Sequence, residues 1–341
     1  MSSRILWLVF ASALASNCCG TCHAQDVAPE SIKVAAAQLL TDVGRLDDNK
    51  QKIVAAMREA SQRKCQVVLF HEGCLTGYPN GQQIQGIDFA AVRAAESEIR
   101  QLAEELQLAV LLGSTGKVGD QYLNYVLVID ETGRALGQYH KTWRAGEPHY
   151  TAGSGPVIFR VAGVEATVII CHDLRYPGLA RLGVAAGARI VFIANNESGI
   201  TQEHKLLGYR SMQISRATEN LVYSVMSNCP ADPNHVTRGN CSHGNSKIVA
   251  PIGTIVDEAG VFEERLVVGE LRLARATAST VTRTLGKDPA TVKRYGVTSE
   301  NPAYAAWMQA GLKLVRRLDG SDVPQHLRTP KATAAQPAAT P

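Results

Sequence analysis

Two short, largely apolar runs, Val67–Phe70 and Ala166–Ile170, restrict the fold of this chain more than any other feature. A strand with one solvated face alternates polar and apolar side chains, whereas a continuous apolar run of this length is typical of a strand covered on both faces. Segments whose apolar residues recur with helical spacing flank such runs, for example Arg45–Arg63 and Ala90–Leu106. Helices must therefore be layered over buried strands, so the sequence predicts an α/β fold.

The other segments continue this alternation within one core that spans roughly residues 30–275. The expected order of elements is β-α-β-α-β-β-β-β-α-β-α-β-β-β-β. Further strands are expected at Ile32–Gln38, Ala109–Gly113, Tyr122–Asp130, Ala135–His140, Ile190–Ala194, Leu221–Met226, Ser246–Ala250, Thr254–Val256 and Leu266–Leu271, and further helices at Leu174–Ala186 and Glu203–Asn220. Beyond this core we expect a C-terminal extension at 276–323 with a helix at Ala303–Leu318, followed by a disordered tail at 324–341 that is rich in Pro, Ala and Thr.

The composition excludes several classes of protein. Of the 341 residues, 45% are hydrophobic and 19% are charged, which is enough apolar material for a sizeable core and excludes a wholly disordered chain. The 35 Lys and Arg against 31 Asp and Glu leave a formal net charge of +4 without a long basic run, so a nucleic-acid partner is not expected. No apolar run reaches about 18 residues, so no membrane span is expected either.

The first 24 residues have the pattern of an export signal. A short positive segment, Met1–Arg4, precedes the apolar segment Ile5–Ala15, which has the length of the hydrophobic region of a secretory signal. Small residues allow cleavage after Ala15 or after Ala24, and the later site leaves a polar start at Gln25. We therefore expect a signal peptide at 1–24 and an exported protein, periplasmic or secreted, in an oxidising compartment.

The eight cysteines leave two questions open. Cys19–His23 matches the C-x-x-C-H pattern of haem attachment, but an expected strand starts soon afterwards at Ser31, where a haem domain would need a long wrapping segment. Haem is therefore not expected. Cleavage after Ala24 would leave five cysteines, so at least one thiol would stay unpaired. Cys229 and Cys241 bracket a loop and could form a disulfide, an alternative that the sequence leaves open.

Three reactive side chains fall at the carboxyl ends of expected strands: Glu72, Lys141 and Cys171. Ligands of open α/β sheets bind beyond the carboxyl ends of the strands. A carboxylate can accept the proton of a thiol, and a lysine ammonium stabilises both a thiolate and a developing oxyanion. The three groups together suffice for acyl transfer at a carbon–nitrogen bond. Taken singly, each also has a structural interpretation, as a turn residue, a solvated strand end or a small buried side chain.

Longer segments around these residues resemble the nitrilase superfamily of carbon–nitrogen hydrolases. The matching segments, which cover about 32–272, are Phe70–Gly73, Thr76–Pro79, Tyr139–Lys141 and Ile169–Pro177, with support from Ala36–Gln38, Arg216–Asn220 and Gly244–Gly253. The resemblance implies a catalytic triad of Glu72, Lys141 and Cys171. It also implies a four-layer α-β-β-α sandwich that forms a homodimer or larger homo-oligomer, and a reaction that needs no cofactor.

The resemblance implies supporting residues as well. Many members have a second glutamate that braces the lysine, and Glu147 is the acidic residue that closely follows Lys141. The backbone N–H of His172 is expected to bind the oxyanion. Two positions beside the pocket depart from the family pattern, with His71 in place of proline and Gly178 in place of glutamate. Further candidates for substrate contact, each with a packing or turn role as the alternative, are Tyr78, Trp143, Asn195 and Asn196.

The sequence thus predicts a hydrolase that cleaves the non-peptide C–N bond of a small amide or N-carbamoyl compound through a cysteine thioester. Nitrile hydrolysis is the alternative, although true nitrilases of the family usually have Trp-Glu after the nucleophile, where this chain has His172 and Asp173. A binding protein without turnover and an acyltransferase are further alternatives, the latter belonging to a membrane-embedded branch. No metal is expected, because His71, His140 and His149 lack a recognisable ligand spacing.

Overall fold

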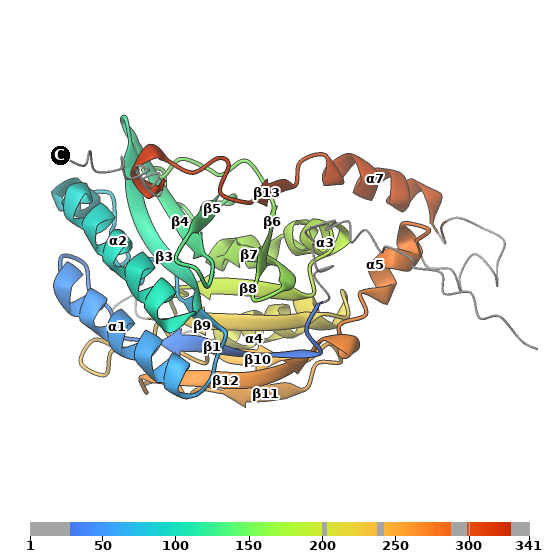
Figure 1. The fold of residues 1–341 in the computed structure, drawn as a ribbon, viewed down its shortest axis with the longest axis horizontal. Coiled ribbons are helices and arrows are strands. Elements are labelled where there is room, and N and C mark those ends of the chain that lie inside the picture. Colours follow the sequence, from blue (N-terminus) through green and yellow to red (C-terminus); the bar gives the residue numbers. More distant parts are fainter. Residues whose placement is uncertain (1–27, 200–202, 237–241, 288–298, 300, 329–341) are drawn as a thin grey trace, which may run out of the picture.

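The computed structural model describes residues 28–199, 203–236, 242–287, 299 and 301–328. The expected signal peptide and Cys241 lie outside the described residues, and so does the question of a disulfide between Cys229 and Cys241. Within the described residues, two β-sheets stack face to face and helices cover their outer faces (Figure 1). This arrangement confirms the expected layered α/β sandwich.

The first sheet has the strand order β12-β1-β2-β3-β4-β5. Its three central strands are parallel, and the remaining strands pair antiparallel to their neighbours. Helices α1 (Leu46–Gln62) and α2 (Phe89–Leu106), blue and cyan in Figure 1, pack on its outer face. The strands are β1 (Ser31–Gln38), β2 (Val67–Phe70), β3 (Ala109–Val118), β4 (Gln121–Ile129), β5 (Ala135–His140) and β12 (Arg265–Arg272).

The second sheet has the strand order β11-β10-β9-β8-β7-β6-β13, with β7, β8 and β9 parallel. Its outer face is covered by α3 (Pro177–Ala185), α4 (Glu203–Thr218), α5 (Ser279–Thr284) and α7 (Pro302–Leu312). The strands are β6 (Val157–Val161), β7 (Val164–Ile170), β8 (Ile190–Asn195), β9 (Tyr223–Asn228), β10 (Lys247–Val249), β11 (Ile255–Glu258) and β13 (Arg316–Leu318). None of the helices in the described ranges is long and apolar enough to cross a bilayer.

The apolar run of β2 shows why a covered strand needs no polar residues. Val67 and Leu69 point into the core between the two sheets, whereas Val68 and Phe70 point into the core beneath α1 and α2. Successive side chains of a strand face opposite sides, so a strand with a core on each side buries every residue. The residues that follow such a strand therefore lie at the buried end of the sheet, and Glu72 follows β2 there.

Three local expectations need correction. The helix expected at Ala303–Leu318 ends at Leu312. The last residues of that expected segment instead form strand β13 beside β6, and the sequence did not predict β13. The helix expected at Leu174–Ala186 starts only at Pro177, because a 3-10 turn precedes it and a proline suits the first turn of a helix. Leu327, which lies in the expected disordered tail, is instead buried against the core beneath α1 and α2.

Candidate active site

The site forms where strand ends of the two sheets meet. Glu72 follows β2 and Lys141 follows β5 in the first sheet, whereas Cys171 follows β7 in the second. The backbone N–H of Glu72 donates to the carbonyl oxygen of Asn195 at 3.2 Å, which joins the edge of one sheet to that of the other. All three reactive side chains are buried. The fold thus brings a carboxylate, an ammonium group and a thiol together in a place largely shielded from water.

Lys141 lies between two carboxylates. Its Nζ is 2.8 Å from Oε1 of Glu72 and 3.0 Å from Oε2 of Glu147. The hydroxyl of Tyr78 is 3.4 Å from the same nitrogen. The backbone N–H of Ala145 donates to Glu147 at 3.0 Å and holds that carboxylate in place. Glu147 therefore contacts the lysine, and its bracing role stays a prediction.

Glu72 is held by donors on both of its oxygens. Besides Lys141, the side-chain amide of Asn124 on β4 donates to Oε1 at 2.7 Å. The backbone N–H of Asn196 donates to Oε2 at 3.1 Å. Asn124 was not identified from the sequence, although a polar residue within an otherwise apolar strand is a signal that could have found it. These contacts direct the carboxylate into the site.

Cys171 lies in a strained turn. Its φ of 45° is in the left-handed region, which non-glycine residues seldom adopt and which often marks functional sites. Asp173 stabilises the turn by accepting hydrogen bonds from the Ile170 N–H at 3.1 Å and from the Tyr139 hydroxyl at 2.7 Å. It also accepts the Trp143 N–H at 2.7 Å, which ties the cysteine turn to the loop that carries Lys141.

The electrostatics keep the thiol protonated and the lysine charged. Burial raises the pKa of Cys171 well above its usual value, and the nearby carboxylates of Glu72 and Glu197 add to this while Lys141 opposes it. Burial would lower the pKa of Lys141, but that pKa is raised on balance, and the neighbouring carboxylate of Glu72 is the largest cause of the rise. Burial and the neighbouring Glu72 raise the pKa of Glu147 to about 8. The proton of the thiol must therefore be removed when the sulfur attacks.

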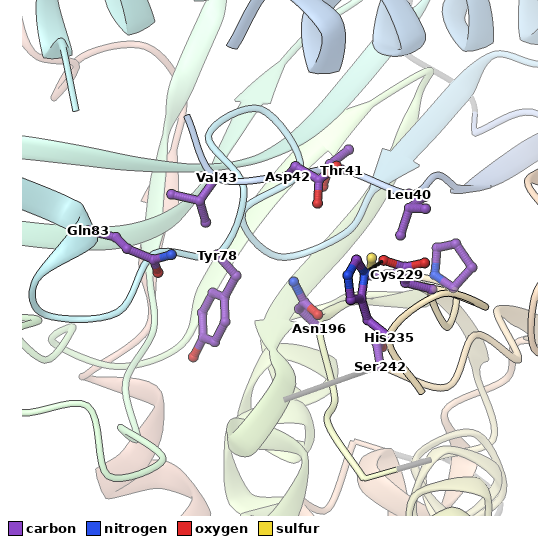
Figure 2. A pocket seen from close by; sticks show the side chains of 12 residues that line it. Leu40, Thr41, Asp42, Val43, Tyr78, Gln83, Asn196, Cys229, His235 and Ser242 are labelled. Carbon is purple, nitrogen blue, oxygen red and sulfur yellow. Dashed lines mark hydrogen bonds and ion pairs between the residues drawn. The ribbon is translucent and has the colours of Figure 1, made fainter. Parts of the chain in front are cut away.

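A cavity of about 460 Å³ opens onto Cys171, Glu147 and Glu197. It is lined by Tyr78, Arg144, Ala145, Gly146, Glu147, Cys171, His172, Arg175, Asn196, Glu197, Ser198, Lys205 and Tyr209. A second pocket of about 280 Å³ adjoins it and shares Tyr78 and Asn196 with it (Figure 2). The volume of the cavity at Cys171 suits a small organic molecule. Among the described residues, no group of three or more His, Cys, Asp or Glu is arranged to hold a metal ion.

The candidate substrate-contact residues divide into two groups. Tyr78, His172 and Asn196 line the cavity. The side chain of Asn195 is instead buried and donates to the sulfur of Met226 at 3.2 Å, so only its backbone takes part in the site. Trp143 does not line this cavity: it is 46% exposed.

Glu197 is, with Asn124, a residue of the site that the sequence interpretation missed. It comes two residues after β8, is buried, and lies with its Oε2 3.2 Å from the sulfur of Cys171. An acidic residue beside Asn196, directly after a strand that ends at the active edge, was the available signal. The two residues are distant in sequence and lie on different strands, so only the fold reveals the contact.

Comparison with known proteins agrees with this geometry. The profile of the carbon–nitrogen hydrolase family matches residues 33–280. A "Hydrolase in agr operon" of Staphylococcus lugdunensis is 31% identical over 211 residues, which cover 59% of this chain and 86% of that protein. The 2-oxoglutaramate amidase of Bacillus subtilis is 26% identical over 246 residues, covering 70% of this chain and 90% of that protein.

Solved structures share the fold. An amidase from Nesterenkonia sp. AN1, of the nitrilase superfamily, superimposes with a TM-score of 0.66 at 24% sequence identity, over 80% of this chain and all of that one. The family profile spans most of the chain and includes Glu72, Lys141 and Cys171. This chain therefore belongs to the carbon–nitrogen hydrolase family, which its sequence resembles.

Proposed function

We propose that this carbon–nitrogen hydrolase acts on a small amide or N-carbamoyl compound and releases ammonia or an amine and a carboxylic acid. The contact of Lys141 with the carboxylate of Glu72, at 2.8 Å, carries the proposal, together with Cys171 and Glu147 on the wall of one cavity. Base, cation and nucleophile are then available to the same carbonyl carbon.

The proposed reaction has two halves. Glu72 takes the thiol proton of Cys171 as the sulfur attacks the carbonyl carbon, and Lys141 with the backbone N–H of His172 stabilises the oxyanion. The C–N bond then breaks, Glu72 returns the proton to the leaving nitrogen, and a thioester remains. Water deprotonated by Glu72 attacks the thioester, and the acid leaves as the thiol is restored. Glu147 keeps Lys141 oriented throughout.

The charges around the cavity favour an acidic substrate. Arg144, Arg175 and Lys205 line it together, and the first two are exposed to solvent. Cations placed around an opening attract and orient an anionic group on a ligand. We therefore expect the amide or N-carbamoyl group to be part of a molecule that also carries a carboxylate.

The test is a panel of amides, N-carbamoyl amino acids and nitriles, with ammonia release as the measurement. Each acidic compound is paired with a neutral analogue of the same shape, and each amide with its nitrile. The Cys171→Ala variant is the control for release by any other route. We expect kcat/KM for the best amide or carbamoyl compound to exceed that of the matching nitrile by at least about a hundredfold, because a misplaced oxyanion donor costs about 3 kcal/mol. Equal turnover of the nitrile would contradict the assignment.

A further inference from the structure

The thiol of Cys171 is hydrogen-bonded to an acid that the proposed reaction does not use. Its sulfur donates to Oε2 of Glu197 at 3.2 Å. Among the hydrogen bonds of the described residues, none joins this sulfur to Glu72, whose oxygens accept from Lys141, Asn124 and the Asn196 N–H. The acid that contacts the resting thiol is therefore a different one from the acid that we assign as the base.

Glu197 is held in place by its own surroundings. Its backbone N–H donates to Oδ1 of Asn228 at 3.0 Å. Tyr209, on α4, lines the cavity together with Glu197 and favours its ionised form, and the guanidinium of Arg175 lies 5.2 Å above the ring of Tyr209. A buried carboxylate with these partners has a defined position rather than one of many rotamers. The contact with the Cys171 thiol is thus part of a connected set, not a chance approach.

We propose that Glu197 is a positioning residue that keeps the proton on the Cys171 thiol until a substrate binds. The inference rests on Cys171 being the nucleophile of the proposed function. A carboxylate that accepts a hydrogen bond from the S–H group stabilises the thiol and repels the thiolate. Lys141 has the opposite effect, because its positive charge stabilises the thiolate. The thiol would then stay less reactive toward stray electrophiles and would lose its proton to Glu72 only during attack on the substrate.

The groups around the thiol come from every element that surrounds it. Glu72 follows β2, Lys141 and Glu147 follow β5, and Glu197 follows β8. Tyr209 lies on α4, and Asp173 lies in the turn of Cys171 itself. Burial is the largest cause of the raised Cys171 pKa, and the charges of Glu72 and Glu197 are the next two. Removing the charge of Glu197 should therefore lower that pKa.

The experiment measures the pH dependence of alkylation by iodoacetamide, in which the thiolate sulfur bonds to the methylene carbon and iodide leaves. Peptide mass mapping separates Cys171 from the other cysteines of the chain, Cys241 included. Glu197→Gln keeps the shape but loses the charge, so we expect the midpoint of alkylation to fall by about one pH unit, equivalent to about tenfold faster reaction at pH 7. Glu197→Asp keeps the charge and should stay near the wild-type midpoint.

Two further variants make the result decisive. Glu165→Gln removes a carboxylate from strand β7 that is paired with Arg317 instead of the thiol, so its midpoint should not move. Tyr209→Phe removes the hydroxyl that favours ionised Glu197, so its midpoint should fall, but by less than in Glu197→Gln. An unchanged or higher midpoint in folded Glu197→Gln would overturn the proposal, and so would an unchanged midpoint in Tyr209→Phe if Glu197→Gln does not fold.

A purely structural role for Glu197 is distinguishable from the proposed one. It would lower the melting temperature of Glu197→Gln and leave the alkylation midpoint where it is. Alkylation does not depend on hydrolysis of an amide, so its result is independent of whether the proposed function is correct. If no compound in the panel releases ammonia, the proposed function fails while the midpoint still reports on Glu197.

Discussion

At the scale of single residues, Glu72 has the largest number of tasks. Its oxygens are oriented by Lys141, Asn124 and the Asn196 N–H, and the proposed reaction uses the same carboxylate in both halves. Glu72→Gln keeps the shape and loses the basicity, so we expect activity to fall at least about a hundredfold, in line with the usual contribution of a general base.

The control for Glu72→Gln is Cys65→Ala, which removes a buried thiol outside the cavity and should keep most of the activity. Mass spectrometry of Glu72→Gln during turnover locates the defect. We expect no accumulation of a thioester on Cys171, because the first proton transfer already fails. Rapid acylation followed by slow release would show that another group is the first base.

Glu96 on α2 makes stability depend on pH. It is buried against β4, where it accepts a hydrogen bond from the Tyr125 hydroxyl at 2.5 Å, and burial raises its pKa from 4.5 to about 7. Between these values the folded protein keeps a proton that the unfolded chain releases. The contribution of Glu96 to stability is therefore fully present below about pH 4.5. It falls as the pH rises toward 7, by about 3 kcal/mol.

Glu96→Gln should remove this dependence. Urea unfolding at several pH values measures it, and the difference between the variant and the wild type should change in favour of the variant from pH 4.5 to 7. The matched control is Glu98→Gln. Glu98 lies two residues further along the same helix and is paired with Lys50 at the surface. Parallel pH profiles for Glu96→Gln and the wild type would show that Glu96 is ionised in the folded protein.

At the scale of elements, the close packing of α3 on β7 supports the cysteine turn. A Cβ on Gly183 of α3 would lie 2.5 Å from the Thr167 hydroxyl, too close for any real contact, whereas a Cβ on Gly208 of α4 would meet nothing within 4 Å. Gly183→Ala should therefore push α3 away from β7 and cost about 1–3 kcal/mol of stability. Gly208→Ala should be neutral or stabilising by about 1 kcal/mol, because alanine favours helix.

Thermal unfolding of both variants tests this pair. If α3 positions the nucleophile, Gly183→Ala should also lose activity at temperatures where it remains folded. Equal melting temperatures for the two variants would contradict the packing argument. The prediction is local, because both substitutions are the same change in a helix and differ only in what lies opposite.

At the scale of the whole molecule, we propose that the protein forms a homodimer or larger homo-oligomer. Tyr304 and Trp307 on α7 are exposed and stack at 5.2 Å, and Trp307 packs beside Gly178 at the start of α3. Trp143, also exposed, stacks on Tyr176 at 4.0 Å. Large exposed aromatic residues that gather on one side are typical of interfaces.

Light scattering measures the oligomeric state directly. We expect at least a dimer for the wild type and weaker association for Trp307→Glu, which places a charge on this surface. Lys313→Glu, at the end of the same helix, changes charge by more without removing an aromatic side chain and should associate as the wild type does. A fully active monomer would contradict the proposal.

The export prediction belongs to this scale too, and N-terminal sequencing of the exported protein should find Gln25 as the first residue.

The sequence alone determined the features that depend on neighbours along the chain. The apolar run of β2 requires a cover on both faces, and the reactive residues after β2, β5 and β7 follow from where these strands end. Proline at the start of α3 and the buried pattern of α1 are local in the same sense. The layered fold and the family could therefore be predicted before any contact was known.

Tertiary structure decided everything that depends on residues far apart in sequence. Glu197 reaches the thiol of Cys171 because β8 lies parallel to β7, and Asn124 reaches Glu72 because β4 shares a sheet with β2. Trp143 was a candidate for the pocket wall, and it stacks on Tyr176 and lines a pocket beside the cavity at Cys171 instead of that cavity itself. The order of strands in a sheet sets such meetings, and no local pattern of side chains records that order.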